Sequence, residues 1–159
     1  MTRSKTASAD AGARNTEVAL RSAEPQDDSI LRALLRDAGL PFEDVASSRQ
    51  DFVVAIVDGE IAGCVGLEMF DTAGLLRSLA VREPRRGSGF GSALFERILT
   101  VARRKGGQRL FLLTTTAARF FARRGFESVD RAAAPEAMGK SAQFASLCPS
   151  TAACMHLYL

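Results

Sequence analysis

The sequence predicts an α/β protein in which a mixed β-sheet carries helices on both faces, and three observations support this. A strong hairpin pattern predicts two antiparallel strands, Phe52–Val57 and Ile61–Phe70, joined by the turn pair Asp58-Gly59. Apolar residues at helical spacing over 94–102 predict an amphipathic helix. A nearly continuous apolar run at Leu110–Thr115 predicts a strand that is covered on both faces.

The segment before the hairpin contains one short strand and one helix. Residues 1–16 are small and polar, so we expect a flexible tail there. Val18–Leu20 is expected to form the strand, and Pro25–Asp28 begins the helix with a proline and two acids. Apolar residues continue at helical spacing until Gly39, which ends the helix. Pro41–Ser48 is expected to be a loop or a short helix.

The middle of the chain follows a strand–helix–strand pattern. Asp71–Gly74 predicts a second turn, and Leu75–Val81 predicts the next strand. The helix over 94–102 ends at Gly106-Gly107, and Leu110–Thr115 follows it. Because the two strands are joined through a helix, they are expected to be parallel neighbours.

The last third of the chain returns to short elements. Ala117–Arg124 predicts a short helix that stops at Gly125, and Phe126–Val129 predicts the start of a strand. Pro135–Leu147 mixes weak helical character with loop, and Ala152–Leu159 alternates well enough to be a final strand. The expected order is therefore β, α, three β, α, β, α, β, β.

Length and composition indicate one ordinary globular domain, expected over residues 17–159. Of the 159 residues, 47% are apolar and 25% are charged. No apolar run reaches the roughly 18 residues that cross a bilayer, so no membrane partner is expected. The first residues lack an apolar signal region, and three cysteines cannot all pair within the chain. We therefore expect a reduced protein of the cytoplasm.

The basic residues are clustered, although the net charge is only +3. The clusters lie at 82–86, 97–105 and 119–124, and such clusters are compatible with nucleic-acid binding or with solvated helix faces. No zinc-finger spacing, aromatic RNA-binding motif or helix-turn-helix pattern accompanies them, so no nucleic-acid partner is expected. The third interpretation, a site for a phosphorylated cofactor, depends on the loop that follows.

The loop Arg86-Gly87-Ser88-Gly89-Phe90-Gly91 lies between a predicted strand and a predicted helix. The first N–H groups of a helix have no partner within the helix, and the helix dipole is positive there. Alternate glycines let the backbone approach an anion, and Arg85 and Arg86 add charge. These features predict a pyrophosphate site, with a plain glycine-rich turn as the alternative.

Two common phosphate loops are excluded by the residues at this position. A P-loop ends in Gly-Lys-Ser or Gly-Lys-Thr, whereas Gly91 is followed by Ser92-Ala93. A Rossmann loop has Gly-x-Gly-x-x-Gly with an acid about 20 residues later. Here the third glycine comes one residue early, and position 111 is phenylalanine.

The pattern Arg-x-x-Gly-x-Gly at Arg86, Gly89 and Gly91, after Leu79-Ala80-Val81, resembles the acetyl-CoA motif of the GNAT N-acetyltransferase superfamily. The string from Arg119 to Phe126 resembles the second recurrent motif of that superfamily, a short helix followed by Gly-Phe. A narrower resemblance connects the chain to bacterial arsenic-resistance N-acetyltransferases and to short amino-acid N-acetyltransferases of the glutamate-acetylating type. The strings that carry it are Leu76–Val81, Leu112–Thr116 and Phe144–Pro149.

The resemblance implies the GNAT acyl-CoA N-acyltransferase fold, with the two parallel strands splayed apart. It also implies transfer of the acetyl group from acetyl-CoA to the amine of a small molecule. This molecule is expected to be an amino acid or an amino-acid analogue, arsenical analogues included. Acetyl-CoA is then the co-substrate, and no metal is expected. The residues expected to bind it are Leu79, Ala80, Val81, Arg86, Gly87, Ser88, Gly89, Phe90, Gly91 and Phe121. A homodimer is common in similar proteins.

The catalytic acid and base are harder to identify. Many relatives have tyrosine at the position of Phe121 to protonate the departing thiolate, and phenylalanine cannot do so. Tyr158 is the candidate for the acid that protonates the thiolate instead, with Cys148 and His156 as alternatives. Glu68 is the candidate base, acting through water, unless it is a solvent-facing strand carboxylate. The missing tyrosine also leaves a second function open, an acetyl-CoA-binding module that is catalytically weak.

The acceptor side is predicted from residues near the splay. Alternation along the strand predicts Arg77 on the same face as Leu79 and Val81, where its charge needs a partner. A substrate carboxylate and an internal salt bridge are equal alternatives for that partner. Ser78, Thr114, Thr115 and Thr116 are the candidates for neutral hydrogen bonds to the substrate. Cys148 and Cys154 are candidates for a metalloid, with burial in the core as the alternative.

Overall fold

The computed structural model describes residues 18–45 and 50–159. Its strands are β1 (Ala19–Ser22), β2 (Gln50–Val57), β3 (Glu60–Phe70), β4 (Ala73–Val81), β5 (Arg109–Thr114), β6 (Glu127–Ser128) and β7 (Ala153–Tyr158). Its helices are α1 (Asp28–Asp37), α2 (Phe90–Arg104), α3 (Ala118–Ala122) and α4 (Glu136–Gly139). Single helical turns are η1 (Pro25–Asp27), η2 (Glu83–Arg85), η3 (Arg131–Ala133) and η4 (Gln143–Leu147). The predicted tail and the end of the predicted loop at Pro41–Ser48 lie outside the described residues.

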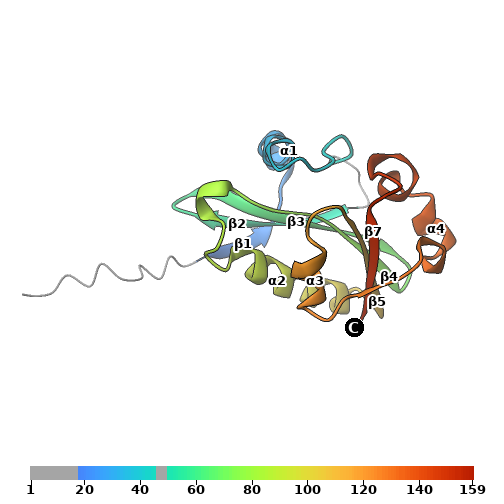
Figure 1. Cartoon of the computed structure of the whole chain (residues 1–159). Helices are drawn as coiled ribbons and strands as arrows, with labels where there is room; N and C mark the ends of the chain where they lie inside the picture. The colour runs from blue at the N-terminus through green and yellow to red at the C-terminus, as the bar shows by residue number, and fades with distance from the viewer. Residues whose placement is uncertain (1–17, 46–49) are drawn as a thin grey trace, which may run out of the picture.

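The described strands form one mixed sheet in the order β1-β2-β3-β4-β5-β7-β6 (Figure 1). Neighbouring strands are antiparallel except β4 and β5, which are parallel as the strand–helix–strand pattern predicts. The hairpin between β2 and β3 is also confirmed. Asp58 and Gly59 both have positive φ, 51° and 78°, which is the conformation that the tightest hairpin turn requires.

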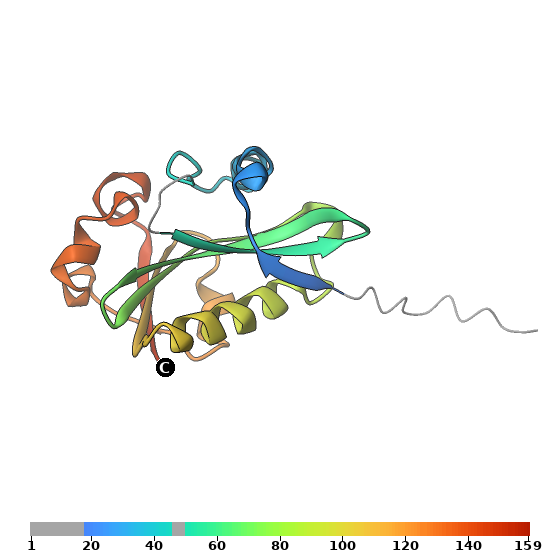
Figure 2. The same ribbon diagram turned by 180° about the vertical axis from the view of Figure 1, so that it is seen from behind.

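Helices cover both faces of the sheet, as predicted (Figures 1 and 2). On one face α2 packs its apolar stripe, including Leu94 and Ile98, against residues such as Val65 and Leu67 of β3. On the other face α1 packs Leu31, Leu34 and Leu35 against β2 and β3. Each fully buried leucine of this kind contributes about 1.5–3 kcal/mol relative to exposure.

The C-terminal half adds a smaller core on the α1 side of the sheet. Met138 of α4 packs with Leu75 of β4 and Phe111 of β5, whereas the adjoining residues Leu76 and Leu112 belong to the core under α2. The continuous apolar run in β5 therefore has the predicted explanation, since both of its faces are covered.

Several element boundaries differ from the prediction; β1, for example, is Ala19–Ser22 rather than Val18–Leu20. β4 begins at Ala73 rather than Leu75, because Ala73 pairs with both Phe70 and Arg109 and shortens the turn before it. α3 ends at Ala122, before Gly125, whose φ of +93° is outside the helical range. β6 is only Glu127–Ser128. Within residues 18–45 and 50–159, no helix combines the length and the apolar character that a membrane span requires.

Candidate functional site

The most distinctive feature of the sheet is the divergence of its two parallel strands. β4 and β5 are paired only where Ala73–Leu75 lies beside Arg109–Phe111, although β4 continues to Val81 and β5 to Thr114. Without ladder hydrogen bonds the strands separate, and a cavity of about 850 Å³ lies between and around their ends. The splay that the family resemblance implies is therefore present.

A bulge in β4 decides which side chains enter the cavity from which face. Gly66 pairs with Arg77 but Cys64 pairs with Ala80, so Ser78 and Leu79 together face the single residue between them on β3. Ser78 has a φ of +59°, which is unusual for a residue other than glycine. Its carbonyl accepts a hydrogen bond from the Cys64 thiol at 3.2 Å.

This bulge makes one prediction wrong. Arg77 is expected from strand alternation to share a face with Leu79 and Val81, but its guanidinium lies over Phe52 in the core under α1. Leu79 and Val81 pack against the core under α2 instead. The extra residue of a bulge shifts the two-residue alternation by one, which moves every following side chain to the opposite face.

At one end of the cavity the lining includes Val81, Arg86 and Gly91. Gly89 is the N-cap of α2 and has a φ of +82°, and Gly87 has a φ of +81°. No heavy atom lies within 4 Å of the position that a Cβ would take on either glycine, so their role is conformational rather than steric. The Arg86 guanidinium donates a hydrogen bond from Nε to the Val81 carbonyl at 3.0 Å.

The start of α2 is electropositive. Its first turn contains no acidic residue, and its N-cap supplies no side-chain acceptor for the free N–H groups. These N–H groups and the helix dipole favour an anion at this position. Of the remaining loop residues, Gly87, Ser88 and Gly89 are exposed, and Phe90 is buried against Val57 and Ala62. Phe90 therefore anchors the loop through its side chain rather than presenting it to a ligand.

An aromatic cluster supports the next wall of the cavity. Phe120 and Phe121 of α3 both line it, and their ring centroids are 5.1 Å apart in an edge-to-face arrangement. Phe121 is buried and also packs edge-to-face on Phe95 and Phe126, with centroids 6.4 and 5.5 Å away. These contacts position a ring, without a hydroxyl group, beside the cavity.

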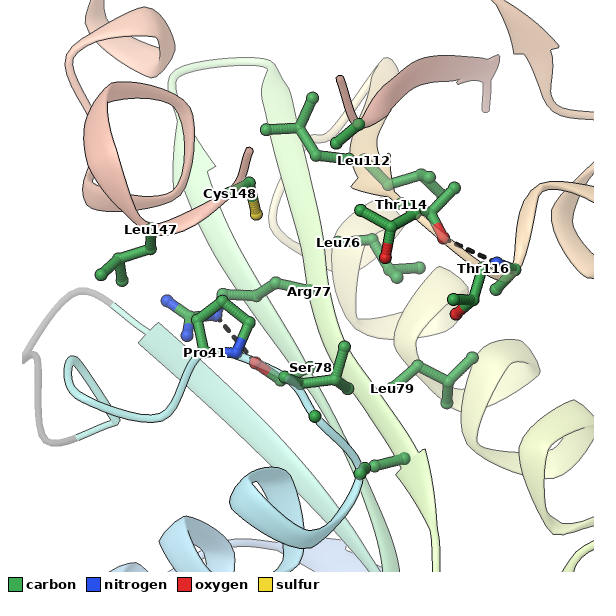
Figure 3. Close-up of a pocket in the computed structure, with 18 of the residues that line it drawn as sticks. Pro41, Leu76, Arg77, Ser78, Leu79, Leu112, Thr114, Thr116, Leu147 and Cys148 are labelled. Carbon is green, nitrogen blue, oxygen red and sulfur yellow. Dashed lines mark hydrogen bonds between the residues drawn. The ribbon is translucent and has the colours of Figure 1, made fainter. Parts of the chain in front are cut away.

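The other end of the cavity is built around the buried Arg77 (Figure 3). Its guanidinium forms a two-pronged ion pair with Asp44, with Nη2 to Oδ1 at 2.6 Å, and Nε donates to the Ser78 hydroxyl at 2.9 Å. The Arg77 side chain is 1% exposed and that of Asp44 is 17% exposed. Of the two alternatives for the partner of Arg77, the internal salt bridge is the one formed here.

Exposed charges of both signs lie around this second end. Arg36, in the last turn of α1, and Glu43, in the loop after it, both line the cavity. From the opposite side come Leu147 and Cys148, which Figure 3 shows at the end of η4. The cavity therefore joins an electropositive helix start to a region of mixed charge.

The three predicted threonines lie together at the end of β5. All of them line the cavity, but Thr114 already accepts a hydrogen bond at Oγ1 from the Ala117 N–H at 2.9 Å. That bond starts the turn into α3. Thr115 and Thr116 are exposed, so their hydroxyl groups remain accessible from the cavity.

The cysteines have different environments. Cys148 lines the cavity and donates a hydrogen bond to Oε1 of Gln143 at 3.0 Å, and partial burial raises the pKa of its thiol. Cys154 is buried in the core with Met138 and outside the cavity lining, and its thiol pKa is also raised by burial. Burial raises the pKa of Cys64 to about 12. Among the residues the structure describes, no cluster of three metal-ligating side chains occurs.

The two residues predicted as catalytic base and acid lie away from the cavity lining. Glu68 pairs with Leu75 and is only 8% exposed, so the alternative of a solvent-facing carboxylate is wrong. Tyr158 is 70% exposed and packs its ring beside Arg109, at the end of β5 opposite to Thr114. His156 accepts a hydrogen bond from Arg109 at Nδ1 in the same place. Neither Glu68 nor Tyr158 is among the residues that line the cavity.

Sequence reasoning missed some of the lining. Phe120, Leu112, Arg36 and the loop from Leu40 to Glu43 all contact the cavity. Phe120 stands next to Phe121 in the second motif, so the motif itself was a usable signal. The loop after α1 offered none, because its contribution depends on how α1 packs on the sheet.

Comparison with known proteins agrees with this architecture. The model of the acetyltransferase (GNAT) family matches residues 17–126. An amino-acid acetyltransferase of Neisseria meningitidis is 31% identical over 137 residues, which cover 80% of this chain but 31% of that relative. The chain thus spans about a third of the length of such relatives. The predicted resemblance to amino-acid acetyltransferases is confirmed, whereas the one to arsenic-resistance enzymes is not shown by these matches.

Solved structures extend the comparison. N-acetylglutamate synthase from Neisseria gonorrhoeae, complexed with coenzyme A and N-acetyl-glutamate, superposes with a TM-score of 0.76 at 26% identity. The alignment covers 90% of this chain and 35% of that one. A Mycobacterium tuberculosis protein in complex with CoA gives a TM-score of 0.75 at 26% identity, covering 89% of this chain and 99% of the other. With its splayed parallel strands and its glycine loop, the chain belongs to the GNAT acetyltransferase family.

Proposed function

We propose that this chain transfers the acetyl group of acetyl-CoA to the amine of a small molecule, an amino acid or an amino-acid analogue. The observation that carries the proposal is the continuous cavity that joins Arg86 and Gly91 at one end to Arg77 and Glu43 at the other. One end suits a phosphorylated donor and the other a small charged acceptor. The related amino-acid acetyltransferases and the related structures with coenzyme A support the same assignment.

The donor end has the features that acetyl-CoA needs. The free N–H groups at the start of α2, together with Arg86, would hold the pyrophosphate. The edge of β4 at Leu79–Val81 has no β5 partner and would receive the pantetheine arm. A Cβ on Gly91 would lie 3.6 Å from the Phe120 ring, so glycine keeps this part of the cavity open.

The acceptor end suits a molecule that carries both an amine and a carboxylate. Arg36 and Glu43 present opposite charges, and arginine binds carboxylates in a two-pronged geometry. Arg77 would contribute to carboxylate binding only by sharing its guanidinium with Asp44. Ser78, Thr115 and Thr116 would supply neutral hydrogen bonds.

Direct attack of the amine on the thioester carbonyl accounts for the chemistry. Holding amine and thioester together supplies much of the rate, and a backbone N–H near Leu79 would polarise the carbonyl. A free α-amino group has a pKa of about 8, so it needs little help from a base. The thiolate that leaves would be protonated most readily by Cys148, which lines the cavity, whereas Tyr158 and His156 lie outside its lining. Burial raises the pKa of the Cys148 thiol, which keeps it protonated and also makes it a weaker acid than an exposed thiol.

A second candidate function is an acetyl-CoA-binding module with weak catalysis. Phe121 favours it, because this ring replaces the tyrosine with which many relatives protonate the thiolate, and three aromatic contacts hold it in place. The two functions share the donor end and differ only in turnover.

A thiol-release assay with acetyl-CoA and a panel of acceptors distinguishes these functions. The panel contains single amino acids, glutamate analogues and arsenical amino acids, each with a control that lacks the acceptor. Thiol release that requires one class of amine would support the transferase. Tight CoA binding without release on any amine would support the module. DNA binding that falls steeply with salt and that CoA does not displace would contradict both.

Assembly and location complete the proposal. We expect a homodimer, which light scattering at two protein concentrations would test. We also expect the protein to act in the cytoplasm, where its thiols stay reduced. Fractionation of cells expressing the full-length protein would check that location.

A further inference from the structure

One side chain connects the two helices at the donor end of the cavity. Arg124, just after α3, lies flat over the Phe120 ring, with its guanidinium carbon 3.4 Å from the ring centroid. It donates from Nη1 to the Phe120 carbonyl at 2.8 Å. It also donates from Nη2 to the Ser92 hydroxyl, in the first turn of α2, at 2.5 Å. We call these three residues the Arg124 clamp.

The clamp shapes the cavity through Phe120. The Phe120 ring lines the cavity and faces Gly91, whose ideal Cβ would be 3.6 Å from it. Arg124 lies over the ring and connects the Phe120 backbone to Ser92 at the start of α2. The separation between Phe120 and Gly91 therefore depends on a residue that is itself absent from the cavity lining.

The charge of Arg124 lies at the electropositive start of α2, and Glu96 of the same helix partly compensates it. Ser92 is in the first turn of a 15-residue helix, where the dipole repels cations and attracts anions. Arg86 is a second cation near the same helix start. Partial burial is the largest influence on the pKa of Arg124 and lowers it, whereas Glu96 raises it and Arg123 lowers it further. A negatively charged ligand at this helix N-terminus would stabilise both cations further.

We propose that Arg124 is a positioning residue for the acyl donor: it holds Phe120 over Gly91 and keeps the start of α2 electropositive. This inference rests on the proposed function, because the donor is the CoA thioester assigned above. Arg124 does not touch the reacting atoms, so its loss should weaken donor binding and leave acceptor binding intact.

The test compares Arg124→Ala with Arg123→Ala, its exposed neighbour of the same type. CoA affinity is measured by calorimetry, and KM is measured separately for acetyl-CoA and for the amine. We expect Arg124→Ala to weaken CoA binding about tenfold or more, from the lost stacking and the charged hydrogen bonds. The KM for the amine should stay within about twofold, because the clamp lies at the donor end of the cavity and effects at separate sites are largely independent. Arg123→Ala should alter neither.

Two further variants keep the inference testable if Arg124→Ala folds poorly. Ser92→Ala removes one acceptor of the clamp, and Arg124→Lys keeps the charge but loses the planar stacking and the fork. Both should fold and should lie between the wild type and Arg124→Ala in CoA affinity. A weaker Arg124→Ala effect in a Phe120→Leu background would show that the two residues act together.

Hydrogen exchange on the free protein separates a role in positioning from a role in binding alone. Without any ligand, we expect the backbone amides of α3 to exchange faster in Arg124→Ala than in Arg123→Ala. If the wild type binds CoA and all clamp variants bind it with the same affinity, the inference is overturned but the proposed function is not. An equal rise of both KM values would also overturn the inference, because it would indicate a general structural role. A wild type that does not bind CoA would overturn both.

Discussion

Substitution of Gly89 by aspartate tests the donor loop most directly. The residue has a φ of +82° and a ψ of 5°, and no heavy atom lies within 4 Å of the place that a Cβ would occupy, so steric clash does not contribute. A residue other than glycine in this conformation loses about 1–2 kcal/mol of folded stability, and less for Asn and Asp. That loss affects the free and bound protein alike and largely cancels in the binding affinity.

The added negative charge does not cancel, because it acts only when a pyrophosphate is bound. Two unit charges about 4 Å apart repel by roughly 1 kcal/mol in water and by about 4 kcal/mol at an effective dielectric constant of 20. At 1.4 kcal/mol per factor of ten, Gly89→Asp should bind CoA about 5- to 700-fold more weakly. Because Gly89 is exposed, salt should reduce the difference.

Gly89→Asn is the matched control, since it has the shape and the backbone strain of aspartate without the charge. Calorimetric titration with CoA at low and high salt, alongside urea unfolding, measures binding and stability separately. We expect the two variants to unfold at similar urea concentrations and only the aspartate variant to lose affinity. Equal CoA affinity of Gly89→Asp and Gly89→Asn would refute the assignment of this loop to a pyrophosphate.

Three other predictions follow from the same structure. Gly91→Ala should raise folded stability by about 0.5–1 kcal/mol, because it replaces a glycine of α2. It should also weaken CoA binding, because the added methyl group narrows the cavity beside Phe120. Thermal melting measures the first effect and calorimetric titration with CoA the second. Arg77→Ala should destabilise the fold by about 3 kcal/mol because it breaks the buried ion pair with Asp44. It should also raise the KM of a carboxylate-bearing acceptor more than that of acetyl-CoA, and equal changes would make Arg77 purely structural. Arg21 donates two hydrogen bonds to Asp27 and lowers the pKa of that carboxyl below its ordinary 3.8. The stabilisation is therefore fully present above about pH 4 and is lost as the pH falls through the depressed pKa, so Asp27→Asn should flatten the acid limb of a urea-midpoint profile.

Local patterns predicted the elements whose geometry depends on a few adjacent residues. Asp58-Gly59 predicted the hairpin because both positions need positive φ, and the structure has it. The apolar run at Leu110–Thr115 predicted a strand covered on both faces, and Leu110 and Phe111 indeed lie in cores on opposite faces. The face of the sheet on which Arg77 lies was predicted wrongly. The bulge at Ser78 arises from pairing with β3, and the residues around Ser78 carry no sequence signal for it.

The proposed donor end is local in the sequence, because a glycine loop, an arginine and a helix start are contiguous from Arg86 to Gly91. The acceptor end was decided only by tertiary structure. Its walls come from the loop after α1, from β4 and from the segment after η4, at positions such as Glu43, Arg77 and Cys148. The ion pair of Arg77 with Asp44 joins residues 33 apart in the chain. The Arg77 guanidinium is buried beside Asp44 only after the loop following α1 has packed on the sheet. Backbone conformation is local, whereas the neighbours of a buried charge are set by the whole fold.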